Sequence, residues 1–372
     1  MKKYEVACYH WSNWHPYGQN DLKRGKGWTE WEYLKGAIPR FVGHRQPRKP
    51  LWGYFDDSDP EIAALQIDAA AGHGIDAFIF DWGWSADDGF GGHGNNLALE
   101  RGFMKAANRD RLKFGLMWCG GYDIGAFDYI IEKYFAQPNY WRVDGGPYIS
   151  IYEMDKFVAA NGGLDAAAEK LAGARAKAER AGLGKVHFAA IEFGLRKDVA
   201  EWVEKLSVDS VTSYAWCHNA LPKGGLYGAY KDWAREAMDF WPVFEKKFGV
   251  PYFPSVSVGW DPSPRCFPDR PYKIGGPLQY HCLDGTYEIA CEPYLSSIVV
   301  DNTPEAFKCA LAEARGYMDR VGATNRAYVG AKNCANIVTL YAWNEWTEGA
   351  YLEPDDQYGM GYLEAVRDVF GG

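Results

Sequence analysis

The stretch IVTLYAWNEWTEG, residues 337–349, joins a short apolar run to a cluster of tryptophans and polar residues. Its first six residues are mostly apolar or β-branched, which is typical of a strand buried in a parallel sheet. Two carboxylates follow, Glu345 and Glu348, one on either side of Trp346. The fold has to explain why two acids stand where a buried strand reaches solvent.

Seven earlier runs of the same kind precede this one, and segments with apolar residues at three- and four-residue spacing separate them. Asp59-Pro60-Glu61 and Thr303-Pro304-Glu305 are typical helix starts, each with a capping residue before a proline. The predicted strands are 4–11, 76–82, 113–119, 148–152, 186–192, 210–216, 252–260 and 337–343. The predicted helices are 60–73, 97–108, 127–135, 165–181, 199–206, 230–248, 304–321 and 358–370.

Eight strand–helix alternations predict an α/β fold of the (β/α)8 TIM-barrel type, with residues 1–372 as a single catalytic domain. A doubly wound sheet is the alternative, but no glycine-rich phosphate turn follows the first strand. Two long connections, 12–59 and 261–301, leave the C-terminal ends of strands one and seven. Loops of that length inside compact domains are usually functional.

The composition narrows the possible partners. A net charge of −9 without a basic stripe argues against nucleic acid. No stretch approaches the ~20 apolar residues of a membrane span, and the N-terminus lacks the apolar core of a signal peptide. The chain is therefore expected in the cytoplasm, unless a signal peptide has been removed. Aromatic residues reach 16%, with 16 Trp and 25 Tyr, which suits the apolar faces of sugar rings.

The ends of the predicted strands collect aromatic and polar side chains, and in a TIM barrel the active site lies at the C-terminal strand ends. Each of these residues alone also fits a structural role, because a Trp can complete a barrel layer and an Asp can cap a helix. Together they predict binding of an oligo- or polysaccharide. The predicted substrate-binding residues are His10, Trp11, Asp81, Trp82, Trp84, Trp118, Tyr152, Glu192, Tyr214, Trp216, Trp260, Asp261, Trp343, Asn344 and Trp346.

Carboxylates are the main candidates for chemistry. The chain contains no H-E-x-x-H, P-loop or G-x-S-x-G motif, so we expect neither a metal nor a cofactor. Paired carboxylates are the usual equipment for glycoside cleavage, which makes Glu345 and Glu348 the predicted catalytic residues. They converge only if the chain turns after Trp346, and Gly349 favours such a turn. The alternative is that Glu348 caps the next segment. Trp343 and Trp346 are expected to desolvate the general acid and raise its pKa.

Several motifs of the chain resemble those of WbsX-like proteins, which are related to glycoside hydrolase family 99, the endo-α-mannosidases and endo-α-mannanases. The similarity spans essentially the whole chain and implies the same barrel. The motifs are KGWTEW (26–31), PRFxGHxQP (39–47), GYFD (53–56), DPE (59–61), GIDAF (74–78), WNEWxEG (343–349) and LEP (352–354).

The resemblance implies a retaining hydrolase without an enzyme nucleophile. Glu345 would act as base on the 2-hydroxyl of the sugar, which attacks C1 to form a 1,2-anhydro sugar, and Glu348 would be the general acid. Such substrate assistance is a recognised exception to the two-carboxylate rule. Family 99 usually has His at the position of Thr347, so the resemblance leaves the sugar preference open. Deoxymannose units such as rhamnose share the axial 2-hydroxyl with mannose and are candidates as well.

Three other functions fit the same residues. An ordinary two-carboxylate mechanism would partner Glu345 or Glu348 with Asp261 or Glu192. WbsX-like proteins also occur in gene neighbourhoods for polysaccharide synthesis, which suggests a glycosyltransferase. A barrel that binds carbohydrate without turnover is the non-catalytic alternative.

Overall fold

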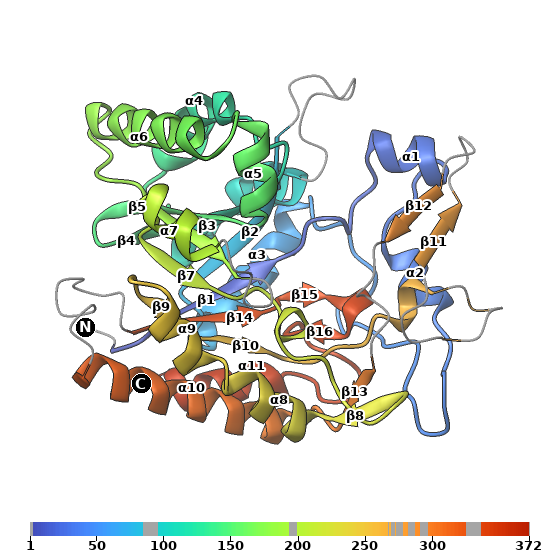
Figure 1. Ribbon diagram of the computed structural model, residues 1–372. Coiled ribbons are helices and arrows are strands. Elements are labelled where there is room, and N and C mark those ends of the chain that lie inside the picture. Colours follow the sequence, from blue (N-terminus) through green and yellow to red (C-terminus); the bar gives the residue numbers. More distant parts are fainter. Residues whose placement is uncertain are drawn as a thin grey trace.

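The computed structural model describes residues 3–84, 96–192, 199–266, 268, 272, 278–281, 287–290, 297–324 and 336–371. Nine parallel strands form a nearly closed barrel, with helices around it (Figure 1). The strands are β1 (Glu5–His10), β2 (Ala77–Gly83), β3 (Lys113–Gly120), β5 (Gly146–Ile151), β6 (His187–Ile191), β7 (Ser210–Thr212), β9 (Tyr252–Phe253), β10 (Ser255–Ser257) and β14 (Ile337–Tyr341).

These nine strands occupy the eight positions predicted from the sequence. β9 and β10 flank Pro254, which lacks the N–H that a central strand donates to the ladder, so one strand position is interrupted there. β7 pairs with β9, β10 pairs with β14, and β14 pairs with β1. The predicted TIM barrel is therefore confirmed.

Most predicted helices are present, with α4–α6 at the top of Figure 1 and α8, α10 and α11 at the bottom. Asp59 accepts a hydrogen bond from the backbone N–H of Glu61, and Thr303 accepts one from Ala306, so both predicted caps form. The helices are α3 (Pro60–Gly72), α4 (Phe127–Ile130), α5 (Met154–Ala160), α6 (Leu164–Arg180), α7 (Val199–Lys205), α8 (Tyr230–Met238), α9 (Trp241–Lys247), α10 (Pro304–Thr324) and α11 (Gly361–Phe370).

Three predicted helices differ from the structure, and in residues 127–135 a π turn, Ile131–Phe135, follows α4. Residues 97–108 contain a π turn (Ala98–Gly102) and a 3-10 turn (Phe103–Lys105), because Gly102 packs so closely that a Cβ there would lie 2.5 Å from the carbonyl oxygen of Asp57. Residues 230–248 divide into α8 and α9 at Asp239 and Phe240. Pro242 lies in the first turn of α9, where a proline is tolerated, and it lacks the N–H that would continue α8.

The two long connections meet beside the C-terminal end of β14. The first contains α1 (Gly18–Arg24) and α2 (Trp31–Gly36), and the second begins with the 3-10 turn Ser263–Arg265, which contacts α2. Further along, β11 (Leu278–His281) pairs with β12 (Tyr287–Ala290), and β13 (Ile298–Val300) pairs with β8 (Tyr227–Ala229). No helix in the described ranges is long and apolar enough to cross a membrane.

Candidate active site

The chain turns sharply after Trp346. β15 (Asn344–Glu345) and β16 (Ala350–Tyr351) form a short antiparallel hairpin, and a 3-10 turn, Trp346–Glu348, connects them. Gly349 closes the turn with a φ of 64°, in the left-handed region that glycine adopts without steric cost. We call Glu345–Gly349 the catalytic turn. This turn reverses the direction of the chain, which is the condition under which Glu345 and Glu348 were predicted to converge.

Both glutamates contact one guanidinium. Arg265, at the start of the second long connection, donates from Nη1 to Glu348 Oε1 and from Nη2 to Glu345 Oε2, the latter at 3.3 Å. On their other sides, Tyr341 donates to Glu348 Oε2 and Tyr214 donates to Glu345 Oε1 at 3.1 Å. Glu345 is 3% exposed and Glu348 is 5% exposed. Two buried acids that share one cation are equipped for proton transfer.

Glu30 accepts hydrogen bonds from Arg265 and Thr347, and it was not predicted as a site residue. Its Oε2 accepts from Trp11 Nε1 at 2.8 Å and from Asn13 Nδ2 at 2.9 Å. Its Oε1 accepts from Thr347 and, at 3.0 Å, from Arg265 Nη2. The KGWTEW motif already placed this carboxylate between two tryptophans, but its spacing gives no sign that it meets the last strand.

Burial and neighbouring charges shift the pKa values of three carboxyls at the site, those of Glu345, Asp81 and Glu30. Burial, followed by the charge of Glu348, raises the pKa of Glu345 well above its usual range, and Arg265 opposes this shift. Burial also raises the pKa of Asp81 well above its usual range. Burial opposes ionisation of Glu30 too, but Arg265 and its other donors lower its pKa. The described part of the chain contains no group of His, Cys, Asp and Glu suited to a metal ion.

Asn344 and Trp11 link the last strand to the first. The Asn344 side chain accepts from the backbone N–H of Trp11 and donates to its carbonyl oxygen, both at 2.8 Å. His10, one residue earlier, packs against Phe80 with ring centroids 4.5 Å apart, and burial lowers its pKa to about 4. These contacts favour structural roles for Asn344 and His10 over the predicted contact with a sugar.

Most of the predicted tryptophans lie in the core. Six of them are at most 2% exposed: Trp82, Trp118, Trp216, Trp260, Trp343 and Trp346. The indole N–H of Trp82 donates to Tyr134, that of Trp216 to the Ser255 carbonyl, and that of Trp346 to Glu353. Their polar edges are therefore used by the protein itself, which favours packing over contact with a ligand.

Three further aromatic candidates have different surroundings. Tyr152 lies beside Tyr214, with ring centroids 5.2 Å apart, and so borders the glutamate pair. Trp84 is partly buried and lies 5.3 Å from Tyr129, on the side of β2 where Trp82 packs. Trp260 is 2% exposed and immediately precedes Asp261.

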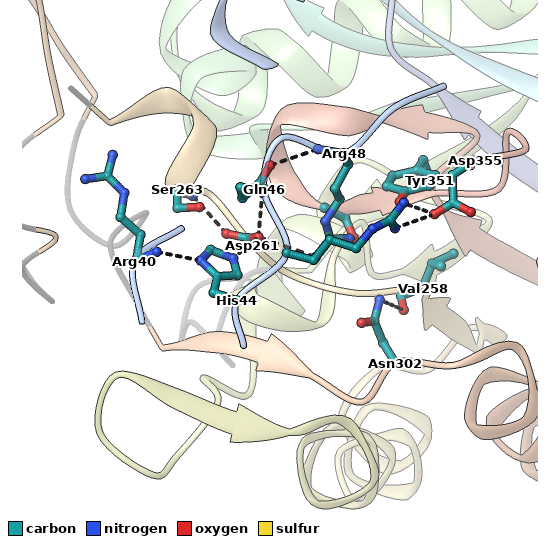
Figure 2. A network of polar contacts seen from close by, with 12 residues as sticks. Arg40, His44, Gln46, Arg48, Val258, Asp261, Ser263, Asn302, Tyr351 and Asp355 are labelled. Carbon is teal, nitrogen blue, oxygen red and sulfur yellow. Dashed lines mark hydrogen bonds and ion pairs between the residues drawn. The ribbon is translucent and has the colours of Figure 1, made fainter. Parts of the chain in front are cut away.

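Asp261 anchors the first long connection instead of joining the glutamate pair (Figure 2). It accepts from His44 Nε2 and Gln46 Nε2, both at 2.8 Å, from Arg48 Nη2 at 3.4 Å, and from the backbone N–H of Ser263. Burial opposes ionisation, but the hydrogen bond from His44 and the charge of Arg48 hold the pKa of Asp261 well below its usual range. A carboxylate so fully engaged is a structural anion.

Glu192 lies apart from the catalytic turn. Its side chain is buried, and its Oε1 is 3.9 Å from the ammonium of Lys247 in α9. The backbone N–H of Glu192 donates to the carbonyl oxygen of Thr212 in the neighbouring strand position. The structure therefore does not bring Glu192 into contact with Glu345 or Glu348.

The catalytic turn and the KGWTEW segment both lie where a family model matches this chain. The model, described as glycosyltransferase WbsX, matches residues 6–120 and 290–366. The chain belongs to the WbsX family. Two strains of Xanthomonas campestris pv. campestris have a relative named "Uncharacterized protein WxcX", 26% identical to this WbsX-family chain over 394 residues, covering 98% of this chain and 49% of the relative. The chain thus spans about half the length of the curated relatives that it matches.

Solved structures with a similar fold include glycoside hydrolases. A glycoside hydrolase-like protein superposes with a TM-score of 0.62 at 15% identity, covering 100% of this chain and 94% of the other. The GH99 endo-α-mannosidase from Bacteroides thetaiotaomicron superposes with a TM-score of 0.54 at 16% identity, covering 99% and 96%. At these identities the similarity shows the fold, so the WbsX-family chain has a glycosidase-like barrel.

Proposed function

We propose that this protein is a retaining glycoside hydrolase acting on α-mannose-configured glycans or on glycans of related deoxy sugars such as rhamnose. The observation that carries the proposal is the meeting of Glu345 and Glu348 on Arg265 at the C-terminal end of the barrel. This face is where TIM-barrel enzymes place their catalytic groups. The similarity of the fold to that of family 99 supports the same reaction class.

Glu345 acts as the base in the proposed reaction. It removes the proton from the 2-hydroxyl of the sugar, and O2 attacks C1 to form a 1,2-anhydro sugar. A general base works best when its pKa lies near the working pH, so the raised pKa of buried Glu345 suits this task. The step requires O2 trans to the leaving group, as in α-mannosides and α-rhamnosides.

Glu348 acts as the acid. It donates a proton to the leaving glycosidic oxygen as the C1–O bond breaks, and then takes a proton from the water that opens the anhydro ring. Arg265 Nη1 donates to Glu348 Oε1 and Tyr341 donates to Oε2, so the protein holds both oxygens of the proposed acid in place. As the anhydro ring opens, Glu345 returns its proton to O2.

The placement of other carboxylates weighs against a conventional enzyme nucleophile. Asp261 is engaged by His44, Gln46 and Arg48, and Glu192 lies near Lys247. Asp261 meets the turn through its backbone N–H, which donates to the Glu348 carbonyl oxygen, while its carboxylate accepts from His44 and Gln46. A direct nucleophile would have to lie on the face of the sugar opposite the acid.

A glycosyltransferase is the second candidate enzyme, because the description of the matching family model names this activity. A nucleotide-sugar donor brings a diphosphate, which proteins usually bind with several cations or a helix N-terminus. In the described part of the site, the carboxylates Glu30, Glu345 and Glu348 gather around the single guanidinium of Arg265. That charge balance favours a neutral sugar over a diphosphate.

Substitution of each glutamate tests the proposal. Incubation with a panel of mannose- and rhamnose-containing glycans, followed by mass spectrometry of the products, should show cleavage by the wild-type protein. E345Q and E348Q should each lose about 10²–10⁴-fold in rate, as is usual when an acid or base is removed. E153Q is the control, because Glu153 also follows a barrel strand but hydrogen-bonds Tyr122. Full activity in E345Q and E348Q, or glycan binding without any turnover by the wild type, would reject the proposal.

A further inference from the structure

We propose that Asp81 is a third carboxyl of the site, held in its protonated form as a positioning residue that directs the Tyr214 hydroxyl onto Glu345. The inference deepens the proposed function and rests on it for its kinetic consequences. Its structural part concerns the location of one proton and stands on the geometry of three side chains.

The hydroxyl of Tyr214 lies between two carboxyls. Its oxygen is 2.9 Å from Asp81 Oδ2 and 3.1 Å from Glu345 Oε1. A phenol has a single hydrogen to donate, so it fills one of these two contacts. The other contact joins two oxygens at hydrogen-bond distance, and it is favourable when the carboxyl supplies the hydrogen. One of the two carboxyls is therefore protonated.

The surroundings assign that proton to Asp81. Burial raises the pKa of both carboxyls, but the cation of Arg265, 3.3 Å from Glu345, opposes the shift at Glu345. In the described part of the chain, Asp81 Oδ1 is buried without a hydrogen-bond partner, and Asp81 as a whole is 6% exposed. An ionised carboxylate with an unpartnered buried oxygen is costly, whereas the carbonyl oxygen of a neutral acid is far less so.

The barrel fixes Asp81 in this position. Successive residues of a strand point to opposite faces, and Trp82 points outward to donate to Tyr134. Asp81, one residue earlier in β2, therefore points inward, toward Tyr214 across the barrel. The titratable groups that face it are Tyr9 of β1, Cys119 of β3, Tyr214 after β7, and both glutamates of the catalytic turn.

The protonated acid gives the site a defined chain of donors. Asp81 donates to the oxygen of Tyr214, and Tyr214 then donates its own hydrogen to Glu345, which stays ionised and oriented as the base. When Asp81 loses its proton at high pH, it competes with Glu345 for the phenol hydrogen. Asp81 thereby places an alkaline limit on the orientation of the base.

The test compares a neutral isostere with a truncation. D81A should lower kcat about 10- to 100-fold, the loss expected when a catalytic group is misplaced by about 1 Å. D81N should recover most of that loss, because its amide is neutral and can donate to the Tyr214 oxygen. D81N should also remove the alkaline limb of the pH profile. Equal impairment of D81N and D81A would overturn the inference, since an ionised Asp81 cannot be replaced by an amide. In the background of Y214F, which removes the shared hydroxyl, D81A should add no further loss.

An infrared difference spectrum decides the structural part without a substrate. At pH 7 the wild-type protein should show the carbonyl band of a protonated carboxyl that is absent from D81N. Absence of this difference in a folded D81N, checked by thermal unfolding, would overturn the inference. If the wild-type protein cleaves no glycan while the band is present, the proposed function fails and the assignment of the proton to Asp81 stands.

Discussion

Replacement of Gly349 by alanine should test the geometry on which the proposed mechanism depends. Gly349 has a φ of +64°, and a Cβ at this position would lie 2.7 Å from Asp261 Cβ and 3.1 Å from the Asp261 backbone nitrogen. Asp261 cannot move aside easily, because His44 and Gln46 hold its carboxylate and its N–H donates to the Glu348 carbonyl. The alanine methyl therefore has to displace the catalytic turn.

The expected cost has two parts. An L-residue in the left-handed region loses about 1–2 kcal/mol. Overpacking against a fixed neighbour adds about 1–3 kcal/mol. The sum for G349A is a loss of about 2–5 kcal/mol in the free energy of unfolding. Glu348 precedes the altered residue, so the rate of glycan cleavage should fall as well.

Gly359 provides a matched control in the same part of the chain. Its φ is +54°, and no atom lies within 4 Å of a Cβ built there. G359A should therefore show the conformational cost alone, about 1–2 kcal/mol, and leave activity unchanged. Urea unfolding followed by tryptophan fluorescence measures both variants. Equal destabilisation of G349A and G359A would refute the close packing of the catalytic turn on Asp261.

Three further predictions concern buried charges. In R265M, loss of the cation favours the protonated form of Glu345, so the acid limb of the activity profile should move to higher pH. The control R175M removes a similarly buried arginine and should leave the profile in place; an unmoved limb in both variants would contradict the role of Arg265. D261N should lower the free energy of unfolding, measured in urea, by about 3–5 kcal/mol, because the buried charge of Arg48 loses its carboxylate partner. The activity per folded molecule should stay unchanged. Burial raises the pKa of Glu353 to about 8 from 4.5, so the wild type should lose stability between pH 4.5 and 8, by at most about 1.4 kcal/mol per pH unit. E353Q should remove this part of the pH dependence, and an unchanged slope would contradict the assignment.

The eight strand positions could be predicted because each depends on a short local pattern of apolar residues. The prediction failed where a tertiary contact decided the local structure. Residues 97–108 have a helical pattern, but Gly102 packs against the Asp57 backbone and the segment adopts a π turn followed by a 3-10 turn. No local pattern reports that contact, because the two residues belong to different segments.

The glutamate pair could be predicted for a similar reason, since Glu345, Glu348 and Gly349 lie within five residues of one another. Glu30 and Arg265 could not be predicted, because they come from the two long connections and lie 235 positions apart. The tryptophans show a second limit. Asp81 and Trp82 both end the same strand, yet alternation sends one into the barrel and the other under the helices.

The hydrogen bonds between Asn344 and Trp11 have a consequence for biosynthesis. They join residues 333 positions apart, and they fix the segment from which the catalytic turn begins. A chain emerging from the ribosome presents Trp11 first and Asn344 only after nearly all other strands have been made. The turn that carries Glu345 and Glu348 can therefore dock on the first strand only after nearly all of the described chain has been synthesised.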